Sequence, residues 1–417
     1  MVGNRRDRDG IEKRAPGHYR VVIELDSDPT QKRRREYHTI HGTLEDAKRL
    51  RAKLMNDKAR GVLVGRSEQL LGAYLESWLE WKRPRVSPRS HERYCSLVRS
   101  SIIPELGGIR LQQLTAQHLD EYYVRSLAEA GQRKESSLSP TTVHHRHVVL
   151  KMALKRAVER GLIVRNPADF ATPPRATRQQ LRVLDETEAK ALEVLLAADP
   201  QQYPALVALK TGARLGEILA MRWSDLDLSA GKLAVRRTLV EPLKRNGGAT
   251  WYSFKEPKNG RERVVDLSAS AVELLKAHKK AQSGVQLAYG AGWTGLGLVF
   301  TNSNGDPLRP STVSTRFRGL VAAMSRCATC KGTGLVEGSK CPKCDGSGST
   351  HEFDGLRFHD LRHSHATIML RLGVAPHVVS QRLGHSTVAF TLDRYGHVLP
   401  GQQLDAAEAF DRAVSGA

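Results

Sequence analysis

The sequence predicts a mainly α-helical protein with small β-sheets, of the α+β class, divided into several domains. The chain has 417 residues, which is enough for two or three domains. Apolar residues recur at helical spacing along most of the chain, whereas strand-like alternation is confined to short runs. Hydrophobic residues make up 40% and charged residues 26% of the sequence, as in an ordinary folded globular protein.

The charge of the chain indicates the kind of partner. There are 65 Lys and Arg against 44 Asp and Glu, a formal net charge of +21, and the sequence isoelectric point is near 10.0. This excess favours binding to a polyanion such as nucleic acid. No stretch approaches the roughly 20 apolar residues of a membrane-spanning helix, and the N-terminal segment lacks the apolar core of a secretory signal. We therefore expect an intracellular protein that meets nucleic acid and has no membrane partner.

Residues 1–62 predict a small sheet followed by one helix. Residues 1–14 are polar and charged, so we expect them to be disordered. Residues 18–25 and 36–40 alternate between apolar and polar side chains, as strands do, and a charged turn joins them. Residues 44–57 then place apolar side chains on one helical face.

A helical domain is expected over residues 66–165, after a short linker at residues 61–67. Its apolar residues form four faces at helical spacing, and each face predicts one helix. The four faces fall near residues 70–79, 94–102, 119–127 and 141–160.

Basic residues in these two regions are candidate contacts to nucleic-acid phosphate. The alternative for each of them is an ordinary solvated surface position without a specific role. The candidates in the charged turn are Lys32, Arg33, Arg34 and Arg35, and those in the helical region are Arg85, Arg89, Arg93 and Arg146.

A linker rich in Pro, Thr and Arg, residues 166–182, separates the helical region from a third domain at residues 183–400. Asp185 and Glu188 form a capping signal for the first helix of that domain. Residues 401–417 form a tail. Further elements are expected as helices at residues 269–281, 311–324 and 402–414 and a short strand at residues 298–300.

The residues between 358 and 395 carry groups that suit chemistry on a phosphate. The guanidinium of Arg362 can bind two phosphate oxygens at once, which a lysine cannot do. His359 and His385 can donate hydrogen bonds to the same oxygens or move protons near neutral pH. The phenol of Tyr395 can attack phosphorus and hold it covalently. Apolar spacing and glycines predict two helices whose ends bring these groups together.

Two upstream motifs add cationic groups. Arg214 precedes an apolar helical face, with Glu217 three residues later. Lys258 comes just before Asn259-Gly260, which is a hairpin signal between strand-like runs and puts the lysine at the hairpin tip. Each of these residues alone is more simply explained as a cap, a core residue or a surface residue. The ordered set is what argues for a shared site.

In order and local context, this set resembles the active-site residues of the tyrosine recombinases, the phage integrase family. The resemblance covers roughly residues 66–400 and rests on Arg214, Lys258, His359, Arg362, His385 and Tyr395. It implies an arm-type DNA-binding domain at residues 1–62, a core-binding domain at residues 66–165 and an α-rich catalytic domain with a β-hairpin at residues 183–400.

The resemblance also implies a mechanism. Tyr395 would attack a scissile phosphodiester, leaving a 3'-phosphotyrosyl link and a free 5'-hydroxyl. Arg214 and Arg362 would neutralise the phosphorane, and Lys258 would protonate the leaving oxygen. By the same resemblance, the remaining residues would assist as follows: His359 as acid or base, His385 as a donor to a phosphate oxygen, Glu217 as support for Arg214, and His363 as a supporting or packing residue.

Partners and location follow from the same resemblance. We expect double-stranded DNA with core and arm-type attachment sites, a homotetramer on DNA, and a directionality factor or host DNA-bending protein. The place of action would be the cytoplasm of a bacterial host, at the nucleoid, and the chemistry would need no cofactor. Two other functions stay open on the same fold: a non-catalytic DNA-binding regulator and a type IB-like topoisomerase.

One segment departs from the family pattern. Residues 325–350 contain two C-x-x-C pairs ten residues apart, each followed by glycines that permit tight turns. This spacing suits one tetrahedral structural Zn²⁺, and it resembles the cysteine-rich repeats of J-domain chaperones. We expect an inserted zinc knuckle; the alternatives are four free thiols, or a zinc-dependent chaperone or adaptor, for which no J-domain is present. The expected ligands are Cys327, Cys330, Cys341 and Cys344.

Overall fold

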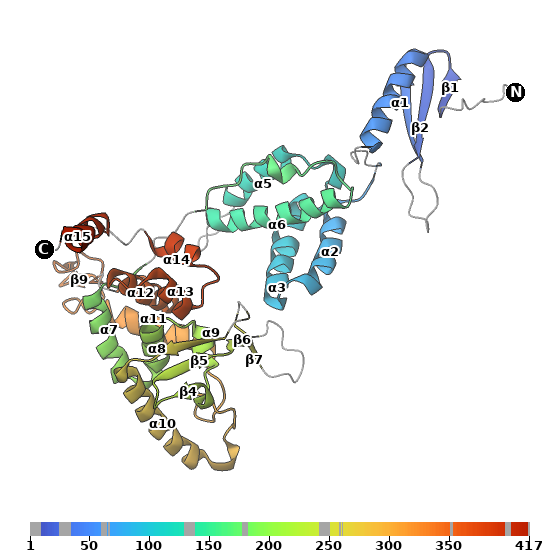
Figure 1. The fold of residues 1–417 in the computed structure, drawn as a ribbon. Coiled ribbons are helices and arrows are strands. Elements are labelled where there is room, and N and C mark those ends of the chain that lie inside the picture. The colour runs from blue at the N-terminus through green and yellow to red at the C-terminus, as the bar shows by residue number, and fades with distance from the viewer. Residues whose placement is uncertain are drawn as a thin grey trace. The chain divides into compact units, whose positions relative to one another are not determined.

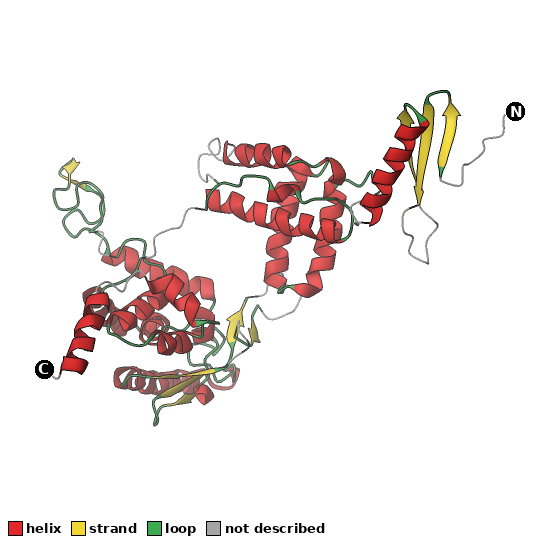
Figure 2. Cartoon of the chain, turned by 45° about the horizontal axis from the view of Figure 1, so that its top comes forward, coloured by secondary structure: helices red, strands yellow, loops and turns green. Residues whose placement is uncertain are grey.

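The computed structural model is mainly helical with small antiparallel sheets, as the sequence predicts (Figures 1 and 2). It falls into two compact units, Met1–Arg178 and Gln179–Ala417, and each is described by itself. Within the described residues, no helix has both the length and the apolar composition to cross a lipid bilayer. The described residues are 10–24, 35–59, 65, 67–128, 138–176, 182–241, 251–257, 260, 262–350, 353–396 and 402–415.

The first unit begins with an antiparallel sheet in the order β1-β2-β3, which packs against helix α1 (Figure 1). Ile11, Val21 and Ile23 from the sheet and Ala47 and Leu54 from the helix form its core. The bounds are β1 Ile11–Ala15, β2 His18–Glu24, β3 Arg35–His41 and α1 Leu44–Ala59.

Strand β1 is a departure from the expectation of disorder up to residue 14. Ile11 is 4% exposed and lies opposite Val21 in the sheet. The backbone N–H of Val22 also donates to the carbonyl of Gly10 at 2.8 Å. One buried apolar side chain and the strand pairing therefore hold residues whose composition is otherwise polar.

Helices form the rest of the first unit. Ser139 caps α6 by accepting a hydrogen bond from the N–H of Thr142, and Pro140 occupies the first helical position, as its restricted backbone favours. Buried side chains such as Leu75, Leu119 and Leu154 fill the space between the helices. The helices are α2 Leu71–Lys82, α3 Pro88–Leu97, the π-helical turn η2 Val98–Ile102, α4 Ile103–Leu106, α5 Ala116–Ala128 and α6 Pro140–Glu159, with 3-10 turns η1 Arg83–Arg85, η3 Leu111–Gln113 and η5 Pro167–Asp169.

The start of the expected linker at residues 166–182 belongs to this helical core. Asn166 and Ala168 are buried, and the Asn166 amide donates to the carbonyl of Lys151 at 3.2 Å. The N–H of Thr172 donates to the Asp120 carboxylate at 2.7 Å. Few apolar residues mark this stretch in the sequence, but polar side chains and backbone groups attach it to the helices.

The second unit is built around α8, almost all of whose residues are buried between α7 and α12. The first helix, α7, begins with the capping box expected from Asp185 and Glu188. The helices are α7 Glu186–Ala198, α8 Tyr203–Thr211, α9 Leu215–Leu219, α10 Ala269–Tyr289, α11 Pro310–Met324, α12 Phe358–Arg371, α13 Pro376–Leu383, α14 Val388–Tyr395 and α15 Gln402–Ser415, with 3-10 turns η6 Pro200–Gln202, η7 Trp223–Asp225 and η8 Gly290–Gly292.

The strands of this unit form small antiparallel sheets in which β5 pairs with both β4 and β8, and β6 pairs with β7. The bounds are β4 Leu226–Asp227, β5 Lys232–Val235, β6 Thr238–Val240, β7 Ser253–Lys255 and β8 Arg263–Asp266, with the two-residue strands β9 Leu335–Val336 and β10 Ser339–Lys340 in a separate segment.

Two strand expectations need correction. The Asn259-Gly260 signal predicts a hairpin between the flanking strands, but β8 pairs with β5, where Leu233 faces Val265, and β7 pairs with β6. Burial of the apolar pairs therefore decides the partners, and Gly260 only makes a local turn with Pro257. Residues 298–300 are not a strand either: Leu298 forms an isolated bridge with Arg222.

Candidate active site

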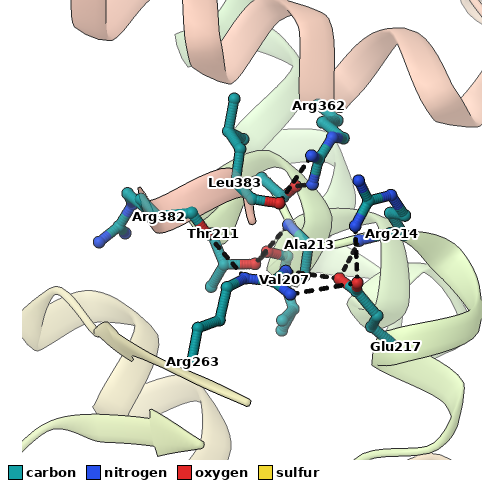
Figure 3. A network of polar contacts seen from close by, with 10 residues as sticks. Val207, Thr211, Ala213, Arg214, Glu217, Arg263, Arg362, Arg382 and Leu383 are labelled. Carbon is teal, nitrogen blue, oxygen red and sulfur yellow. Dashed lines mark hydrogen bonds and ion pairs between the residues drawn. The ribbon is translucent and has the colours of Figure 1, made fainter. Parts of the chain in front are cut away.

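Arg362 is the fifth residue of α12 and is held between the ends of two other helices. Its Nη1 donates to the carbonyl of Gly212, at the end of α8, and its Nη2 to that of Leu383, at the end of α13, both at 2.7 Å (Figure 3). Only 3% of Arg362 is exposed. Burial and the nearby charge of Arg214 lower the pKa of Arg362 to about 9, so the guanidinium remains charged at neutral pH.

A glycine is required where α8 ends. Gly212 has a φ of +68°, and a Cβ there would lie 2.5 Å from Leu383 Cδ2 and 2.8 Å from His365 Cδ2. The left-handed turn lets the chain leave α8 and reach Arg214 two residues later. The same turn exposes the carbonyl that Arg362 uses.

Arg214 occupies the N-cap position of α9 and contacts Glu217 in two ways. Its backbone N–H donates to Glu217 Oε2 and its Nη1 donates to Glu217 Oε1, both at 2.9 Å (Figure 3). The Glu217 side chain is 2% exposed, whereas the Arg214 side chain is 31% exposed. Glu217 therefore anchors a guanidinium that solvent, or a phosphate, can still reach.

Arg263, on β8, is a third arginine of the site that the sequence analysis did not assign. Its Nη2 donates to Glu217 Oε2 at 2.6 Å and its Nη1 to Glu217 Oε1 at 3.2 Å. Burial alone would raise the pKa of Glu217, but the hydrogen bonds and charge of Arg263, with those of Arg214, hold it below its ordinary value. A sequence signal existed, because Arg263 is two residues from buried Val265 and so shares its inward face.

Tyr395 ends α14 with its hydroxyl against a histidine. The residue is 2% exposed, and the hydroxyl lies 2.7 Å from His363 Nδ1. Burial raises the pKa of Tyr395, although Arg362 opposes that effect. Burial and the neighbouring His359 lower the pKa of His363 to about 4. Neutral His363 thus accepts a hydrogen bond from the neutral phenol, a contact that the sequence does not predict.

His385 and His359 complete the cluster. His385 follows the left-handed Gly384 at the end of α13, and its Nδ1 lies 2.8 Å from the hydroxyl of Thr391. Burial, with the charges of Arg362 and Arg214, lowers the pKa of His385 to about 4. The rings of His385 and Tyr395 are nearly parallel, with centroids 6.3 Å apart. His359 packs edge-on against His363, and burial and Arg362 lower its pKa too.

The structure thus gathers around one place all the expected catalytic and supporting residues that it describes. Lys258 lies outside the described residues. Arginines whose charges would repel one another are held together by a buried carboxylate and by helix-end carbonyls, so the site is preorganised for an anion such as phosphate. The gathered residues are Arg214, Glu217, Arg263, His359, Arg362, His363, His385 and Tyr395.

The residues expected to contact DNA differ in how exposed they are. Arg146 is 9% exposed, and its Nη1 donates to the Ser126 hydroxyl at 3.1 Å, so it is a packing residue rather than a surface contact. The reason is its place on α6, where neighbours such as Val143 and Leu150 face the core. Lys32, Arg33 and Arg34 lie outside the described residues, whereas Arg35, Arg85, Arg89 and Arg93 are exposed.

A second candidate site lies in the inserted segment between α11 and α12. The four sulfurs of Cys327, Cys330, Cys341 and Cys344 lie within 4.8 Å of one another, and all four residues are buried. Sγ of Cys327 is 3.8 Å from that of Cys341, and Sγ of Cys330 is 3.7 Å from that of Cys344. Four thiolates at about 2.3 Å from a tetrahedral Zn²⁺ would be roughly 3.8 Å apart, so the donor set fits this metal.

The backbone around the sulfurs repeats itself. After each pair, a hydroxyl bonds back to the second cysteine: Thr333 Oγ1 to the carbonyl of Cys330, and Ser347 Oγ to that of Cys344, both at 2.7 Å. The repeats also interlock, since Cβ atoms at Gly334 or Gly348 would lie 2.3 or 2.5 Å from carbonyl oxygens of the other repeat. Glycine at these positions is therefore a condition for bringing the four thiols together.

Family models and a full-length relative match this chain. Residues 181–401 match the phage integrase family, and residues 70–127 match a phage integrase N-terminal SAM-like domain. A tyrosine recombinase XerC-like protein of Caldanaerobacter subterraneus subsp. tengcongensis is 24% identical, with 96% of this chain and 97% of the relative covered.

Solved structures show the same fold. The Tn1549 transposon integrase in complex with transposon right end DNA gives a TM-score of 0.64 at 20% identity, covering 82% of this chain and 99% of that one. A lambda integrase tetramer bound to a Holliday junction gives a TM-score of 0.51 at 16% identity, covering 92% and 97%.

Proposed function

The chain belongs to the phage integrase family of tyrosine recombinases, and we propose that it recombines DNA at specific sites through a covalent link to Tyr395. The observation that carries this proposal is the placement of the Tyr395 hydroxyl beside His363 in the same cluster as Arg362 and Arg214. A nucleophile, a proton acceptor and a cationic phosphate site are the parts that phosphoryl transfer to a side chain requires.

The reaction has two mirrored steps. The Tyr395 oxygen bonds to the phosphorus of one DNA strand, the bond from phosphorus to the 5' oxygen breaks, and the 3' phosphate remains on the tyrosine. The phenol proton passes to a base, and the departing 5' oxygen takes up a proton. A 5'-hydroxyl from the partner strand then attacks the phosphotyrosine and releases Tyr395. Because one phosphodiester replaces another, no nucleotide needs to be hydrolysed.

Each basic residue has a defined task in this scheme. Arg362 and Arg214 bind the non-bridging oxygens, whose charge grows in the transition state. His363 accepts the phenol proton, and His385 and His359 donate hydrogen bonds to the phosphate once the incoming anion has raised their pKa. Lys258 protonates the 5' oxygen, an assignment that rests on its place in the family's motif.

The partners and the remaining domains follow the family. The relatives named above are an integrase bound to transposon end DNA and an integrase tetramer bound to a Holliday junction. Accordingly, the substrate would be duplex DNA at core sites held by residues 66–165 and at arm-type sites held by residues 1–62. A homotetramer would bring four tyrosines together, assisted by a directionality or DNA-bending factor, in the cytoplasm of a bacterial host.

The four-cysteine segment would hold one structural Zn²⁺. Two sulfur separations near those of a tetrahedral thiolate site support this assignment. Bound there, the metal would cross-link the two repeats and hold the segment folded. It has no part in the transfer steps, which this chain's tyrosine, arginines and histidines perform.

Strand exchange between two duplexes tests the function. The purified protein is mixed with a labelled and an unlabelled duplex, both carrying the DNA that flanks its gene, and the products are sized. We expect recombinant duplexes of new length. Relaxation of supercoiled DNA without exchange would indicate a topoisomerase instead, and binding without any strand cleavage would indicate a regulator.

A further inference from the structure

We propose that Arg263 is a positioning residue for the phosphate-binding arginines, acting on Arg214 through the shared carboxylate of Glu217. The proposal rests on the proposed function, because it concerns the same site. The side chain of Arg263 is 10% exposed. Its Nε, Nη1 and Nη2 all donate hydrogen bonds within the protein, to the carbonyl of Arg382 and to the carboxylate of Glu217.

The first link is to Glu217. Both terminal nitrogens of Arg263 donate to this carboxylate, Nη2 at 2.6 Å and Nη1 at 3.2 Å (Figure 3). Among the described contacts, the Arg214 guanidinium donates to Glu217 through Nη1 alone, to Oε1 at 2.9 Å, while its backbone N–H donates to Oε2. If Arg263 were absent, each carboxylate oxygen would lose one donor, and a second bond from the Arg214 guanidinium, to Oε2, would draw it down towards Glu217. Arg263 thereby leaves N–H groups of Arg214 free for phosphate.

The second link is to the end of α13. Arg263 Nε donates to the carbonyl of Arg382 at 3.0 Å, and Arg382 in turn donates from Nη1 to the carbonyl of Asp266 on β8 at 2.9 Å. The next carbonyl, of Leu383, is the one that Arg362 uses. Arg263, on β8, therefore bonds to the backbone of α13, and Arg382, on α13, bonds to the backbone of β8. Of these two arginines, Arg263 is the one that also contacts Glu217.

Because Arg263 and Arg382 connect the same two elements, a substitution of Arg382 is a matched control for a substitution of Arg263. Arg263→Lys removes the planar fork, since one ammonium group cannot span two carboxylate oxygens and a carbonyl in fixed geometry. Arg382→Lys removes the hydrogen bonds that the Arg382 guanidinium donates to the His365 ring and to the carbonyls of Asp266 and Lys210. It leaves the contacts of Glu217 in place. A purely structural role for Arg263 predicts that the two variants behave alike.

The measurement is the single-turnover rate of covalent adduct formation on a nicked DNA substrate at saturating protein, with DNA affinity and thermal midpoint measured beside it. We expect Arg263→Lys to slow the adduct step by about tenfold or more, as small misplacements of reacting groups do, with DNA affinity unchanged. Arg382→Lys should lower the thermal midpoint and leave the rate constant near that of the wild-type protein. Arg263→Gln, which keeps an amide donor but no charge, should act in the same direction as Arg263→Lys.

A double substitution locates the route of the effect. If Arg263 works through Glu217, then Glu217→Gln also slows the adduct step, and Arg263→Lys adds little to it, whereas independent roles would multiply. A normal rate for Arg263→Lys, or equal slowing by Arg382→Lys, would overturn this inference. In that case, adduct formation by the wild-type protein would still support the proposed function. A wild-type protein that forms no adduct would overturn both.

Discussion

At the scale of single residues, the tyrosine and the histidines of the site are uncharged before DNA binds. The pKa of Tyr395 is raised by burial, and the pKa values of His363 and His385 are lowered to about 4 by burial and nearby positive charge. Neutral histidines beside charged arginines leave the phenol proton in place until an anion arrives. Binding of a phosphate would favour protonated imidazole and so make His363 a better base at the moment of attack.

The contact between His363 and Tyr395 can be tested by two substitutions. His363→Leu removes the acceptor of the phenol proton, so we expect adduct formation to slow by about 100-fold, the usual scale for a lost acid or base. His363→Gln offers an oxygen that accepts a hydrogen bond but does not take up a proton. Equally slow adduct formation by both variants would show that His363 takes up the proton. A normal rate for His363→Gln alone would show that His363 only orients the ring of Tyr395. Normal rates for both variants would show that His363 has no part in the reaction.

The histidines also predict how stability depends on pH. His363, His365 and His385 have pKa values near 4 in the folded protein against an ordinary 6.5. The unfolded chain therefore binds more protons between these values, and stability present above pH 6.5 is lost as the pH falls towards 4. In thermal melts without DNA, His385→Gln should reduce the drop in midpoint between pH 7 and pH 5. Exposed His377→Gln should not, and an unchanged drop in His385→Gln would contradict the assignment.

The role of a residue was predictable from the sequence where a motif indicates that role. It was less predictable where the role depends on whether the side chain is buried. Arg214, Arg362 and Tyr395 were found from their order and context. Arg146 looks like any basic residue of a DNA-binding helix, and only the packing of α6 turns it inward. For Arg263, strand alternation with buried Val265 indicates only that the side chain faces inward. Its partner is a carboxylate 46 residues away, which local pattern does not identify.

At the scale of elements, the site is made from helix ends. Gly212 and Gly384 both have a φ of +68° and end α8 and α13, and each ending presents a carbonyl next to Arg362. Local signals of this kind, including the cap at Asp185, were predictable because they involve a few neighbouring residues. The strand pairing around Gly260 was not, since it depends on which apolar residues are buried together.

The four-cysteine segment yields a prediction of its own. We expect the purified protein to hold one zinc per chain by elemental analysis, and Cys341→Ser to lose most of it, because a hydroxyl is a poor replacement for a thiolate. Cys95 lies in the helical unit outside the cluster, so Cys95→Ser should keep the metal. Equal zinc in all three proteins, or none in the wild type, would refute the site.

At the scale of the whole molecule, charge and domain order explain how a generic phosphate chemistry becomes site-specific. A net charge of +21 supplies attraction to any DNA, and separate DNA-binding regions would supply selection. Composition and periodicity predict a sheet-plus-helix region, then a helical region, then a larger domain; the DNA-binding roles of the first two are proposed from the family resemblance. Which bases they read was not predictable, because base readout depends on side chains placed against a groove.

Deletion of residues 1–62 tests the division of labour. We expect the shortened protein to cleave core-site DNA as before, but to lose its extra affinity for longer attachment DNA that includes distal sites. Its binding to the long DNA should also become less sensitive to salt, because fewer phosphates are contacted. Titrations at two salt concentrations on long and core-only duplexes give both quantities, and identical affinities for the long DNA would show that this region does not read DNA.

The most direct test of the central claim is the identity of the nucleophile. Wild-type protein, Tyr395→Phe and Tyr203→Phe are incubated with a nicked, end-labelled duplex and separated in denaturing detergent. Tyr203 is partly buried in the same unit, so its substitution controls for loss of a phenol. We predict a labelled protein–DNA band for the wild type and Tyr203→Phe, and none for Tyr395→Phe despite normal DNA binding. A covalent band from Tyr395→Phe would contradict the account.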